Sequence, residues 1–364
     1  MEARGVMEAD VLVCGYGPVG ALLAARLAAY GLSVLIVDRA AQACALPRAV
    51  AADGEVLELL DRTVPGATDG FVLDPPVRFL SASRAELGRL RFPVPGLGFY
   101  AQPVLEARLR AHVAGLAQVS VLVGPLTGLA QDRAGVTCVV DGASLRGRWL
   151  VGCDGASSTV RQLAGIGFPG RDLQRWLVCD VEGLVPDRPL FTYTADPALP
   201  QVDMPVPGGH RWEWQLPPRT DALLDPLALV RRDTSTPVRI VRAVPYRFSA
   251  RRASRWRVGR VLLAGDAAHT MPPFAGQGLG AGLRDAWALA ALLARGEVAR
   301  YEPLRVPHVR RTTALSLLLG AVLQARRGTA LRDALLRGAF TAPGLGSWLG
   351  RGGPRPDSSG VLEL

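Results

Sequence analysis

The sequence contains no lysine and no asparagine, so all 42 of its basic residues are arginine. A chain that avoids both residues and is rich in alanine, glycine, proline and arginine has the composition typical of a GC-rich genome. The net charge is +10, but the arginines are scattered along the whole chain. Proteins that bind nucleic acids concentrate positive charge on one face and carry a recognisable module. We therefore expect no nucleic-acid partner, and the charge at most helps to attract anionic ligands.

Cysteine and histidine are scarce. The five cysteines, at 14, 44, 138, 153 and 179, form an odd set without a CxxC pair, and the four histidines are far apart in the sequence. A disulfide framework needs a dense, even set of cysteines, and a metal site needs clustered ligands. The sequence thus predicts reduced thiols, as in the cytoplasm, and no metal centre.

Long apolar runs are also lacking. No stretch reaches the roughly 18 uninterrupted apolar residues of a membrane-spanning helix. The N-terminus opens with acidic residues and lacks the positively charged start of a signal peptide. With 364 residues, 49% of them hydrophobic, the chain predicts a globular cytoplasmic protein without a membrane span, built as one large lobe or two closely joined lobes.

A glycine-rich turn near the N-terminus connects a predicted strand to a predicted helix. Gly15, Gly17 and Gly20 have GxGxxG spacing, and Asp38 ends the next apolar run. This pattern places a pyrophosphate at the helix N-terminus and a carboxylate beside a ribose. It predicts a parallel sheet that binds a dinucleotide, NAD or FAD, with a tight structural turn as the alternative. The strand, the helix and the second strand are expected at residues 10–14, 18–30 and 33–37.

A second glycine-rich segment connects a buried strand, expected at 261–264, to a helix expected at about 279–293. Asp266 follows the strand, where its carboxylate can hold a polyol chain. Glycines at 276, 278 and 280 surround the helix start, where N–H groups can point at an electron-rich ring edge. A flavin accumulates negative charge at such an edge on reduction, so the positive end of the helix favours the reduced form. The segment therefore favours FAD over NAD, with a plain strand-to-helix loop as the alternative.

A third segment, DGASSTVR from Asp154 to Arg161, follows a strand expected to end at residue 151. An aspartate in a turn, followed by serine and arginine, offers hydrogen-bonding groups that can close over a pyrophosphate. The alternative is an ordinary Asp-Gly turn followed by a helix cap.

The amino-acid composition of the chain changes between these segments. Residues 74–100 and 171–250 are rich in proline and predict an antiparallel sheet, with a helix near 221–230. The fold class expected is α/β, with this sheet inserted into a nucleotide-binding lobe. The boundaries expected are 1–73, 101–170 and 251–325 for the discontinuous nucleotide-binding domain, 74–100 and 171–250 for the sheet domain, and 326–364 for a loose C-terminal tail, with a last helix at about 308–324.

Together the three segments resemble the group A flavoprotein monooxygenases, the aromatic hydroxylases of the p-hydroxybenzoate hydroxylase type. The GxGxxG, DG (DGxxSxVR) and GD (Gly265-Asp266) motifs of that family occur here in the same order. The closer resemblance is to the branch of 3-(3-hydroxyphenyl)propionate hydroxylase and the polyketide hydroxylases, through residues 47–49, 102–106 and 266–286. It covers most of residues 9–325 and implies a Rossmann-like, GR2-type FAD-binding lobe with an inserted antiparallel-sheet substrate lobe.

The resemblance implies roles for individual positions. Asp38 would bind the adenosine ribose, Asp266 would hold the ribityl chain, and Gly280 would present its amide to the isoalloxazine ring. Arg48, beside the flavin, and Pro273, with its carbonyl near the substrate ring, are the expected catalytic residues. The residues expected to bind FAD are Gly15, Gly17, Pro18, Val19, Gly20, Asp38, Arg39, Arg48, Gln102, Leu126, Asp154, Asp266, Gly276, Gly278, Leu279 and Gly280.

The resemblance also implies an activity: hydroxylation of a phenolic, aromatic or polyketide substrate with NAD(P)H and O2, through a flavin C4a-hydroperoxide. FAD would be tightly bound and NADPH or NADH transient, because no second glycine fingerprint is present. A homodimer is a further expectation. The sheet lobe is expected to be shortened and a thioredoxin-like C-terminal domain to be absent. Two alternatives therefore stay open: a non-hydroxylating flavin oxidoreductase, such as an epoxidase or reductase, and a truncated FAD-binding protein without catalysis.

Two conspicuous features are expected to have structural roles. The stretch Trp212-Glu213-Trp214 resembles the WxWxIP motif of flavin-dependent halogenases, but those enzymes also need a lysine. We expect a strand of the substrate sheet here, with one or both tryptophans facing the pocket or an interface. His269 follows the predicted ribityl-binding aspartate, and we expect it to pack and hydrogen-bond rather than to act as a base.

Overall fold

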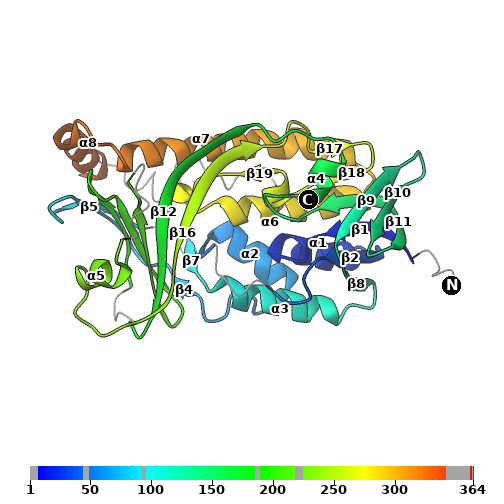
Figure 1. Ribbon diagram of the computed structural model, residues 1–364, viewed down its shortest axis with the longest axis horizontal. Helices are drawn as coiled ribbons and strands as arrows, with labels where there is room; N and C mark the ends of the chain where they lie inside the picture. Colours follow the sequence, from blue (N-terminus) through cyan, green and yellow to red (C-terminus); the bar gives the residue numbers. More distant parts are fainter. Residues whose placement is uncertain are drawn as a thin grey trace.

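The structure is a computed structural model that describes residues 7–43, 49–91, 96–184, 189–217, 224–341, 361–362 and 364. Two eight-stranded sheets, here called the first and the second sheet, lie toward opposite ends of an elongated molecule (Figure 1). Two long strands and a long helix run between the two ends. This arrangement confirms the predicted α/β fold class with a second, mainly antiparallel sheet.

The first sheet contains the predicted parallel strands. Its central strands are buried on both faces, as parallel sheets require, and Leu12, Val13 and Ile36 have no exposed surface. The pairs β18–β11, β11–β1, β1–β2 and β2–β8 are all parallel. In pairing order the strands are β17 (Arg257–Val258), β18 (Val261–Leu263), β11 (Ala143–Gly152), β1 (Met7–Cys14), β2 (Val34–Asp38) and β8 (Val119–Val123), with β10 (Val136–Val140) on β11 and β9 (Leu126–Gln131) on β10.

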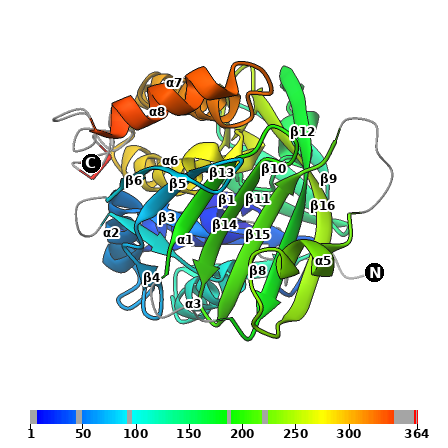
Figure 2. The same cartoon turned by 90° about the vertical axis from the view of Figure 1, so that its left-hand side faces the viewer.

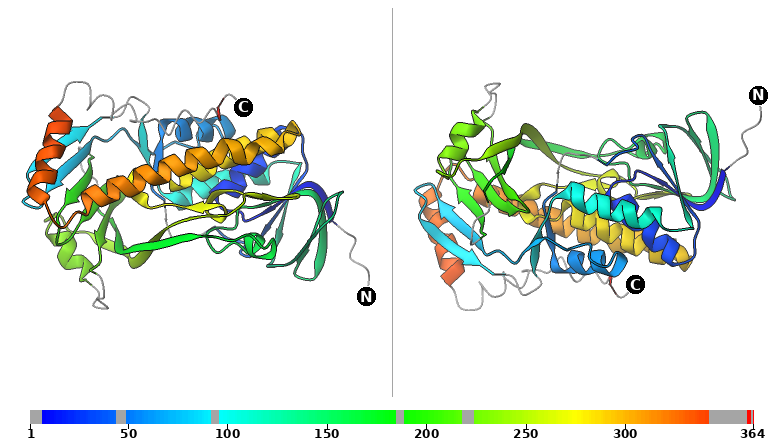
Figure 3. Two further views of the ribbon diagram at one scale, coloured as in Figure 1. Left: turned by 90° about the horizontal axis from the view of Figure 1, so that it is seen from above. Right: turned by 90° about the horizontal axis from the view of Figure 1, so that it is seen from below.

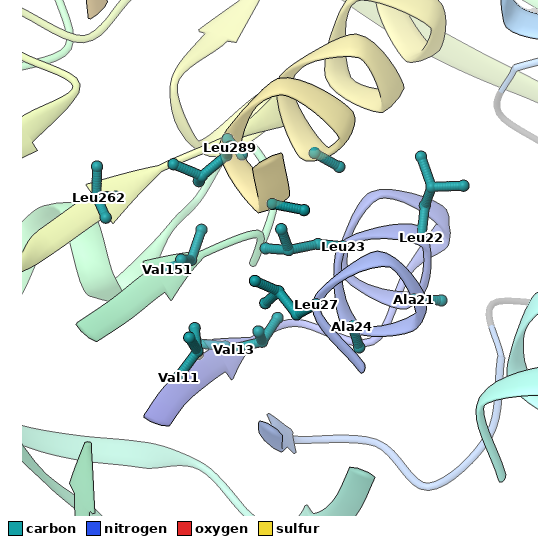
Figure 4. Packing of buried hydrophobic residues seen from close by; sticks show 14 of the residues in the cluster. Val11, Val13, Ala21, Leu22, Leu23, Ala24, Leu27, Val151, Leu262 and Leu289 are labelled. Carbon is teal, nitrogen blue, oxygen red and sulfur yellow. The ribbon is translucent and has the colours of Figure 1, made fainter. Parts of the chain in front are cut away.

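Helix α1 (Pro18–Ala29) packs directly on this sheet. Leu23 and Leu27 point toward Val13 and Val151 of the sheet, and Leu289 approaches from the helix above them (Figure 4). These side chains are fully buried, and each buried leucine contributes about 1.5–3 kcal/mol of hydrophobic stabilisation. The core therefore holds the N-terminus of α1 rigidly against the end of β1.

The second sheet faces the other end of the molecule (Figure 2). Its neighbours pair antiparallel, except that β13 and β5 run parallel. Strands β12 and β16 are long enough to reach from this sheet to the first (Figure 1). In pairing order the strands are β19 (His269–Thr270), β16 (Arg239–Arg252), β12 (Gly170–Glu182), β15 (Gly209–Gln215), β14 (Gln201–Val206), β13 (Phe191–Ala195), β5 (Val77–Ser81) and β6 (Glu86–Leu90).

A small third sheet and the remaining helices complete the molecule. The small sheet pairs β3 (Ala51–Asp53), β7 (Leu97–Phe99) and β4 (Val72–Leu73). The helices are α2 (Gly54–Thr63), α3 (Gln102–Ala114), α4 (Thr159–Leu163), α5 (Pro226–Arg231), α6 (Gly278–Ala294), α7 (Tyr301–Leu323) and α8 (Thr329–Thr341), with single turns η1 (Gly265–Ala267), η2 (Pro273–Ala275) and η3 (Val298–Arg300). None of the helices within these described ranges combines the length and apolarity needed to cross a bilayer.

Two sequence-based expectations for the C-terminal third are wrong. Helix α7 begins at Tyr301 rather than near residue 308, with Pro307 inside it, although a proline inside a helix removes a backbone hydrogen bond. Residues 329–341 form α8 instead of a loose tail, and α8 lies against the second sheet (Figure 3). Phe340 stacks on Phe79 at 4.8 Å between ring centroids, a contact with a distant strand that composition does not reveal.

The domain boundaries expected from the sequence stay a proposal. We propose that the first sheet with α1, α3 and α6 is one domain and the second sheet the other, because each has its own buried apolar cluster. Helix α8 then belongs with the second sheet, since it packs on β5 and β6.

Candidate functional site

The turn after β1 depends on its glycines for steric reasons. Gly15 has φ +105°, and a Cβ there would lie 2.4 Å from the carbonyl oxygen of Cys153. A Cβ on Gly20 would lie 1.9 Å from the Gly15 carbonyl oxygen, whereas one on Gly17 would meet no atom within 4 Å. Gly17 is the N-cap of α1, whose first N–H groups lack helical partners. The turn thus presents an open helix N-terminus, which favours an anion.

Asp38, at the end of β2, lies beside this turn. Its Oδ2 accepts a hydrogen bond from the Tyr16 N–H at 2.6 Å, and its Oδ1 accepts one from the Ala40 N–H at 2.9 Å. These two bonds fix the carboxylate where the βαβ pattern predicts ribose recognition. Arg39 follows it along the same wall.

The segment from Asp154 to Arg161 connects the two sheets rather than forming a lid. Asp154 Oδ2 accepts from the Val160 N–H at 3.1 Å, and burial raises the pKa of Asp154 although hydrogen bonds from Ser158 and the backbone oppose the shift. Arg161 is buried and donates to the carbonyls of Ala156 and Ala267, at 2.7 and 2.9 Å. Arg161 therefore binds neighbouring backbone, so the predicted pyrophosphate contact of this arginine is wrong. Asp154 and Ser157 line the cavity, and their contact with a pyrophosphate stays a prediction.

The segment after β18 carries Asp266. Gly265 has φ +61° and packs against Val19 of α1, so the two glycine-rich turns touch. Further along, Gly276 adopts φ +65° and allows the chain to enter α6 at Gly278. A Cβ on Gly280 would meet Val56 at 3.1 Å, so Gly280 packs against α2.

A single cavity of about 1360 Å³ connects these segments with the second sheet. Gly20 and Gly280 belong to the tightly packed backbone behind it, and Arg48 lies outside the described residues. The cavity therefore brings together residues that the sequence had singled out in separate stretches. The predicted residues that line it are Gly15, Gly17, Pro18, Val19, Asp38, Arg39, Gln102, Leu126, Asp154, Asp266, Pro273, Gly276, Gly278 and Leu279.

A protein-family model described as an FAD binding domain matches residues 8–301. The chain belongs to this FAD-binding family.

Curated relatives are similar to this protein over most of the chain. The 3-(3-hydroxy-phenyl)propionate/3-hydroxycinnamic acid hydroxylase of Mycobacterium sp. is 34% identical over 369 residues, covering 92% of this chain and 64% of the relative. The corresponding hydroxylase 2 of Burkholderia vietnamiensis is 35% identical over 380 residues, covering 95% of this chain and 69% of the relative. The chain thus spans about two thirds of the length of these relatives.

Known structures share the fold. The p-nitrophenol 4-monooxygenase of Pseudomonas putida DLL-E4 superposes with a TM-score of 0.84 at 24% identity, over 97% of this chain and 99% of that one. An aklavinone-11 hydroxylase, in complex with FAD and aklavinone, gives a TM-score of 0.78 at 25% identity, over 90% and 71%. The predicted two-lobe fold is therefore confirmed.

The residues of this chain fit FAD. The space at Gly17 leaves room for a pyrophosphate at the N-terminus of α1, while Gly15 and Gly20 permit the close backbone packing behind it. Carboxylates at Asp38 and Asp266 line the same cavity, where ribose and ribityl hydroxyls need acceptors. FAD is accordingly the cofactor for which this site is built.

Two buried ionic networks hold the FAD site, and the sequence analysis missed both. Arg284, with no exposed surface, donates to Asp53 at 2.7 Å, Glu55 at 2.5 Å and the Gln277 side chain at 3.1 Å. It thereby ties the start of α6 to β3 and α2. A charged residue with apolar neighbours in the middle of a helix is the sequence signal that indicates such a network.

The second network supports the turn that carries Asp266. The Asp285 carboxylate accepts from the Gly265 N–H at 3.1 Å and from Arg305 Nε at 2.8 Å, and its Oδ2 lies 2.6 Å from His269 Nε2. Burial alone would raise the pKa of Asp285, but His269 and Arg305 hold it below its ordinary value. The expected structural role of His269 is confirmed by this contact.

The wall formed by the second sheet is largely aromatic. Tyr193 stacks on Phe79 at 5.3 Å, and its hydroxyl donates to the Phe274 carbonyl at 2.9 Å. Trp176 contacts Phe274 edge-on at 5.7 Å. These rings line the cavity next to Pro273. Flat apolar walls of this kind suit an aromatic ligand.

The expectation that one or both of Trp212 and Trp214 face the pocket or an interface is wrong in the part that concerns the pocket. Both are buried on the other face of the second sheet, where Trp214 donates to Gln201 at 3.1 Å. Side chains alternate along a strand, so Glu213 between them points to the opposite face and lines the cavity.

Proposed function

We propose that this protein is an FAD-dependent monooxygenase that hydroxylates a phenolic or other aromatic substrate. The observation that carries the proposal is the single cavity that joins the FAD site to the aromatic wall of the second sheet. The reaction consumes one aromatic C–H group, O2, NAD(P)H and a proton, and it yields the phenol, water and NAD(P)+. FAD, when bound, supplies the electron transfer from NAD(P)H to oxygen and the delivery of oxygen to the ring.

The chain itself positions the cofactor. The N-terminus of α1 at Gly17 would favour the negative pyrophosphate, Asp38 would accept from ribose hydroxyls, and Asp266 would accept from the ribityl chain. The N-terminus of α6, at Gly278 and Leu279, would favour a flavin whose ring edge gains negative charge on reduction. NADPH or NADH then binds transiently.

The substrate wall orients the ring and excludes water. The rings of Phe79, Trp176, Tyr193 and Phe274 give this part of the cavity an apolar lining, which disfavours solvent. The Pro273 carbonyl, which the sequence predicts near the substrate ring, accepts a hydrogen bond from the Gly276 N–H at 2.7 Å. Its second lone pair is the proposed acceptor for a substrate hydroxyl. Arg48, the other expected catalytic residue, lies outside the described residues. The names of the hydroxylase relatives, which specify hydroxyphenyl acids, support the aromatic class.

The first experiment mixes the purified holoprotein anaerobically with NADPH and follows flavin absorbance with and without a panel of phenols. We expect one phenol to accelerate bleaching, and oxygenation of that mixture to yield a product 16 mass units heavier than the phenol, the mass of one added oxygen. Acceleration without added oxygen in the product would favour a non-hydroxylating oxidoreductase. A yellow protein that no phenol affects would favour FAD binding without catalysis.

The FAD assignment has its own test. Asp266→Ala removes the proposed ribityl acceptor, and we expect the purified variant to retain less FAD per chain than the wild type. Asp172→Ala is the matched control, because Asp172 is an exposed carboxylate that pairs with Arg251 on the outside of the second sheet. Equal FAD content in Asp266→Ala and wild type would contradict the assignment.

We also propose a reducing compartment such as the cytoplasm, because the cysteines at 14, 138, 153 and 179 are free thiols. A homodimer stays a prediction, which light scattering of the purified holoprotein would test.

A further inference from the structure

Glu213 is an ionisable side chain of the cavity wall whose cross-strand neighbours are apolar. Its cross-strand neighbours are Val178 on β12 and Val202 on β14. The residue is 9% exposed and lines the cavity. Glutamate is seldom buried to this degree, and here burial raises its pKa although Arg211 opposes the shift. A carboxyl group in such surroundings favours a ligand group that can hydrogen-bond to it.

The positive charges near Glu213 are engaged by another carboxylate. Arg211 binds both oxygens of Asp180, at 2.6 and 3.0 Å, and Arg242 binds Asp180 at 2.7 Å. The ionic contact from Arg211 to Glu213 is 3.8 Å, longer than a hydrogen bond. The two arginines and two carboxylates carry formal charges that sum to zero. When both carboxyl groups are ionised, these four groups therefore contribute no net positive charge that would favour an anionic ligand.

Glu213 lies within reach of a substrate whose ring is beside Pro273. Tyr193 is in the same cross-strand row as Glu213, two strands away through Val202. Neighbouring strands are about 4.8 Å apart, so the two positions are separated by roughly 10 Å. The Tyr193 hydroxyl in turn bonds to the Phe274 carbonyl, adjacent to Pro273. A ring with a side chain of a few atoms can span this distance.

We propose that Glu213 is a specificity-determining residue that makes the cavity bind a neutral aromatic substrate through a hydroxyl or amino group and reject an aromatic carboxylate. This inference rests on the proposed function, since it concerns the substrate of the same cavity. At a pH above the raised pKa of Glu213, its ionised carboxyl group accepts hydrogen bonds from O–H and N–H groups and repels a second carboxylate. The substrate class therefore differs from the hydroxyphenyl acids after which the curated relatives are named.

The test compares two ligands that differ only in their end group. The wild-type holoprotein is titrated with 3-(3-hydroxyphenyl)propionate and with the matching alcohol, 3-(3-hydroxyphenyl)propan-1-ol, while perturbation of flavin absorbance reports binding. We expect the alcohol to bind at least about tenfold more tightly, because an uncompensated pair of carboxylates at short range costs that much or more. The same titrations are repeated with Glu213→Gln, which keeps the size of the side chain but removes its charge.

The variant and its control separate charge from packing. Glu213→Gln is expected to bring the two affinities to within about threefold of each other. Glu182→Gln is the control, since Glu182 is an exposed glutamate on β12 that pairs with Arg239, and it should keep the wild-type ratio. If Glu213→Gln does not fold, the ratio of the two affinities in the wild-type protein still tests the inference.

Each outcome has a defined meaning. Wild-type protein that binds the acid as tightly as the alcohol overturns the inference alone, and so does a Glu213→Gln variant with the wild-type ratio. A different outcome would overturn both the proposed function and the inference. In that outcome, neither flavin absorbance nor NADPH-driven flavin reduction responds to the acid, the alcohol or any phenol of the panel.

Discussion

The carboxylate of Asp285 holds together three segments behind the FAD site, and Asp285→Asn tests how much that contact contributes. Asp285 accepts from the Gly265 backbone N–H, from Arg305 and, through a 2.6 Å contact, from His269. Asp285 and Arg305 have no exposed surface, and His269 is 1% exposed. An asparagine keeps the shape but cannot neutralise the guanidinium. The variant therefore leaves an uncompensated positive charge in the core.

The expected loss follows from the burial of the pair. Removal of one partner of a buried ion pair typically costs about 3–5 kcal/mol, whereas exposed pairs contribute about 0–1 kcal/mol. His269 and Arg305 lower the pKa of Asp285 against the effect of burial. The contribution of the ionised carboxylate is thus fully present above the unfolded pKa and is lost only as the pH falls through the lower folded value.

Urea unfolding at pH 7, followed by tryptophan fluorescence, gives the free energy of unfolding. We expect Asp285→Asn to lose about 3 kcal/mol or more and to retain less FAD per chain, because the Gly265–Asp266 turn loses its support. The exposed-pair control Asp172→Asn, whose partner is Arg251, should lose less than about 1 kcal/mol. A similarly small loss of unfolding free energy for Asp285→Asn would refute the argument that this network stabilises the Gly265–Asp266 turn.

Three further predictions concern the same lobe. Gly20→Ala places a Cβ 1.9 Å from the Gly15 carbonyl oxygen and should abolish stable folding or FAD retention. The Cβ of Gly17→Ala meets no atom within 4 Å, so this variant should keep the thermal midpoint of the FAD-free protein and lose FAD affinity. FAD titrations and melting curves of both variants check these expectations. Leu27→Ala empties a fully buried position and should lower the free energy of unfolding by about 2–5 kcal/mol in urea. Burial and neighbouring arginines lower the pKa of His308 to about 3, so the folded state keeps this side chain neutral. The free energy of unfolding of the wild type should therefore fall as the pH drops from 6.5 toward 3. His308→Gln should flatten this pH dependence, and an unchanged pH dependence would count against a buried neutral histidine.

The nucleotide-binding half of the molecule was predictable because its signals are local. The requirements at Gly15 and Gly20 arise from contacts within one turn and with the adjacent strand, and they leave a fixed spacing in the sequence. Asp38 and Asp266 each follow a buried apolar strand, so the parallel sheet brings them to the same edge. The sequence could therefore single out residues that line one cavity before their distances were known.

The buried ionic networks could not be inferred in the same way. Arg284 binds Asp53 and Glu55, more than two hundred residues earlier in the chain. Arg305 binds Asp285 from a different helix, in a segment that the prediction placed before the start of α7. Helix periodicity marks these residues as inward-facing, but it does not tell which opposite charge they meet. Only the packing of α6 against α2 and α7 supplies the partners.

The polarity of the substrate wall depends on a single choice of strand register. In β15 the tryptophans and Glu213 alternate, and the pairing of Trp176 with Gln215 and of Val178 with Glu213 directs Glu213 to the cavity. A slip of β15 by one residue would exchange the two faces of this strand. Trp212 and Trp214 would then enter the cavity, and the Glu213 carboxyl group would be buried in an apolar cluster at a cost of several kcal/mol. The hydrogen bond from Trp214 to Gln201 and the aromatic packing beneath the sheet oppose that slip. The stability of the far face of the sheet therefore determines which chemical group the substrate meets on the near face.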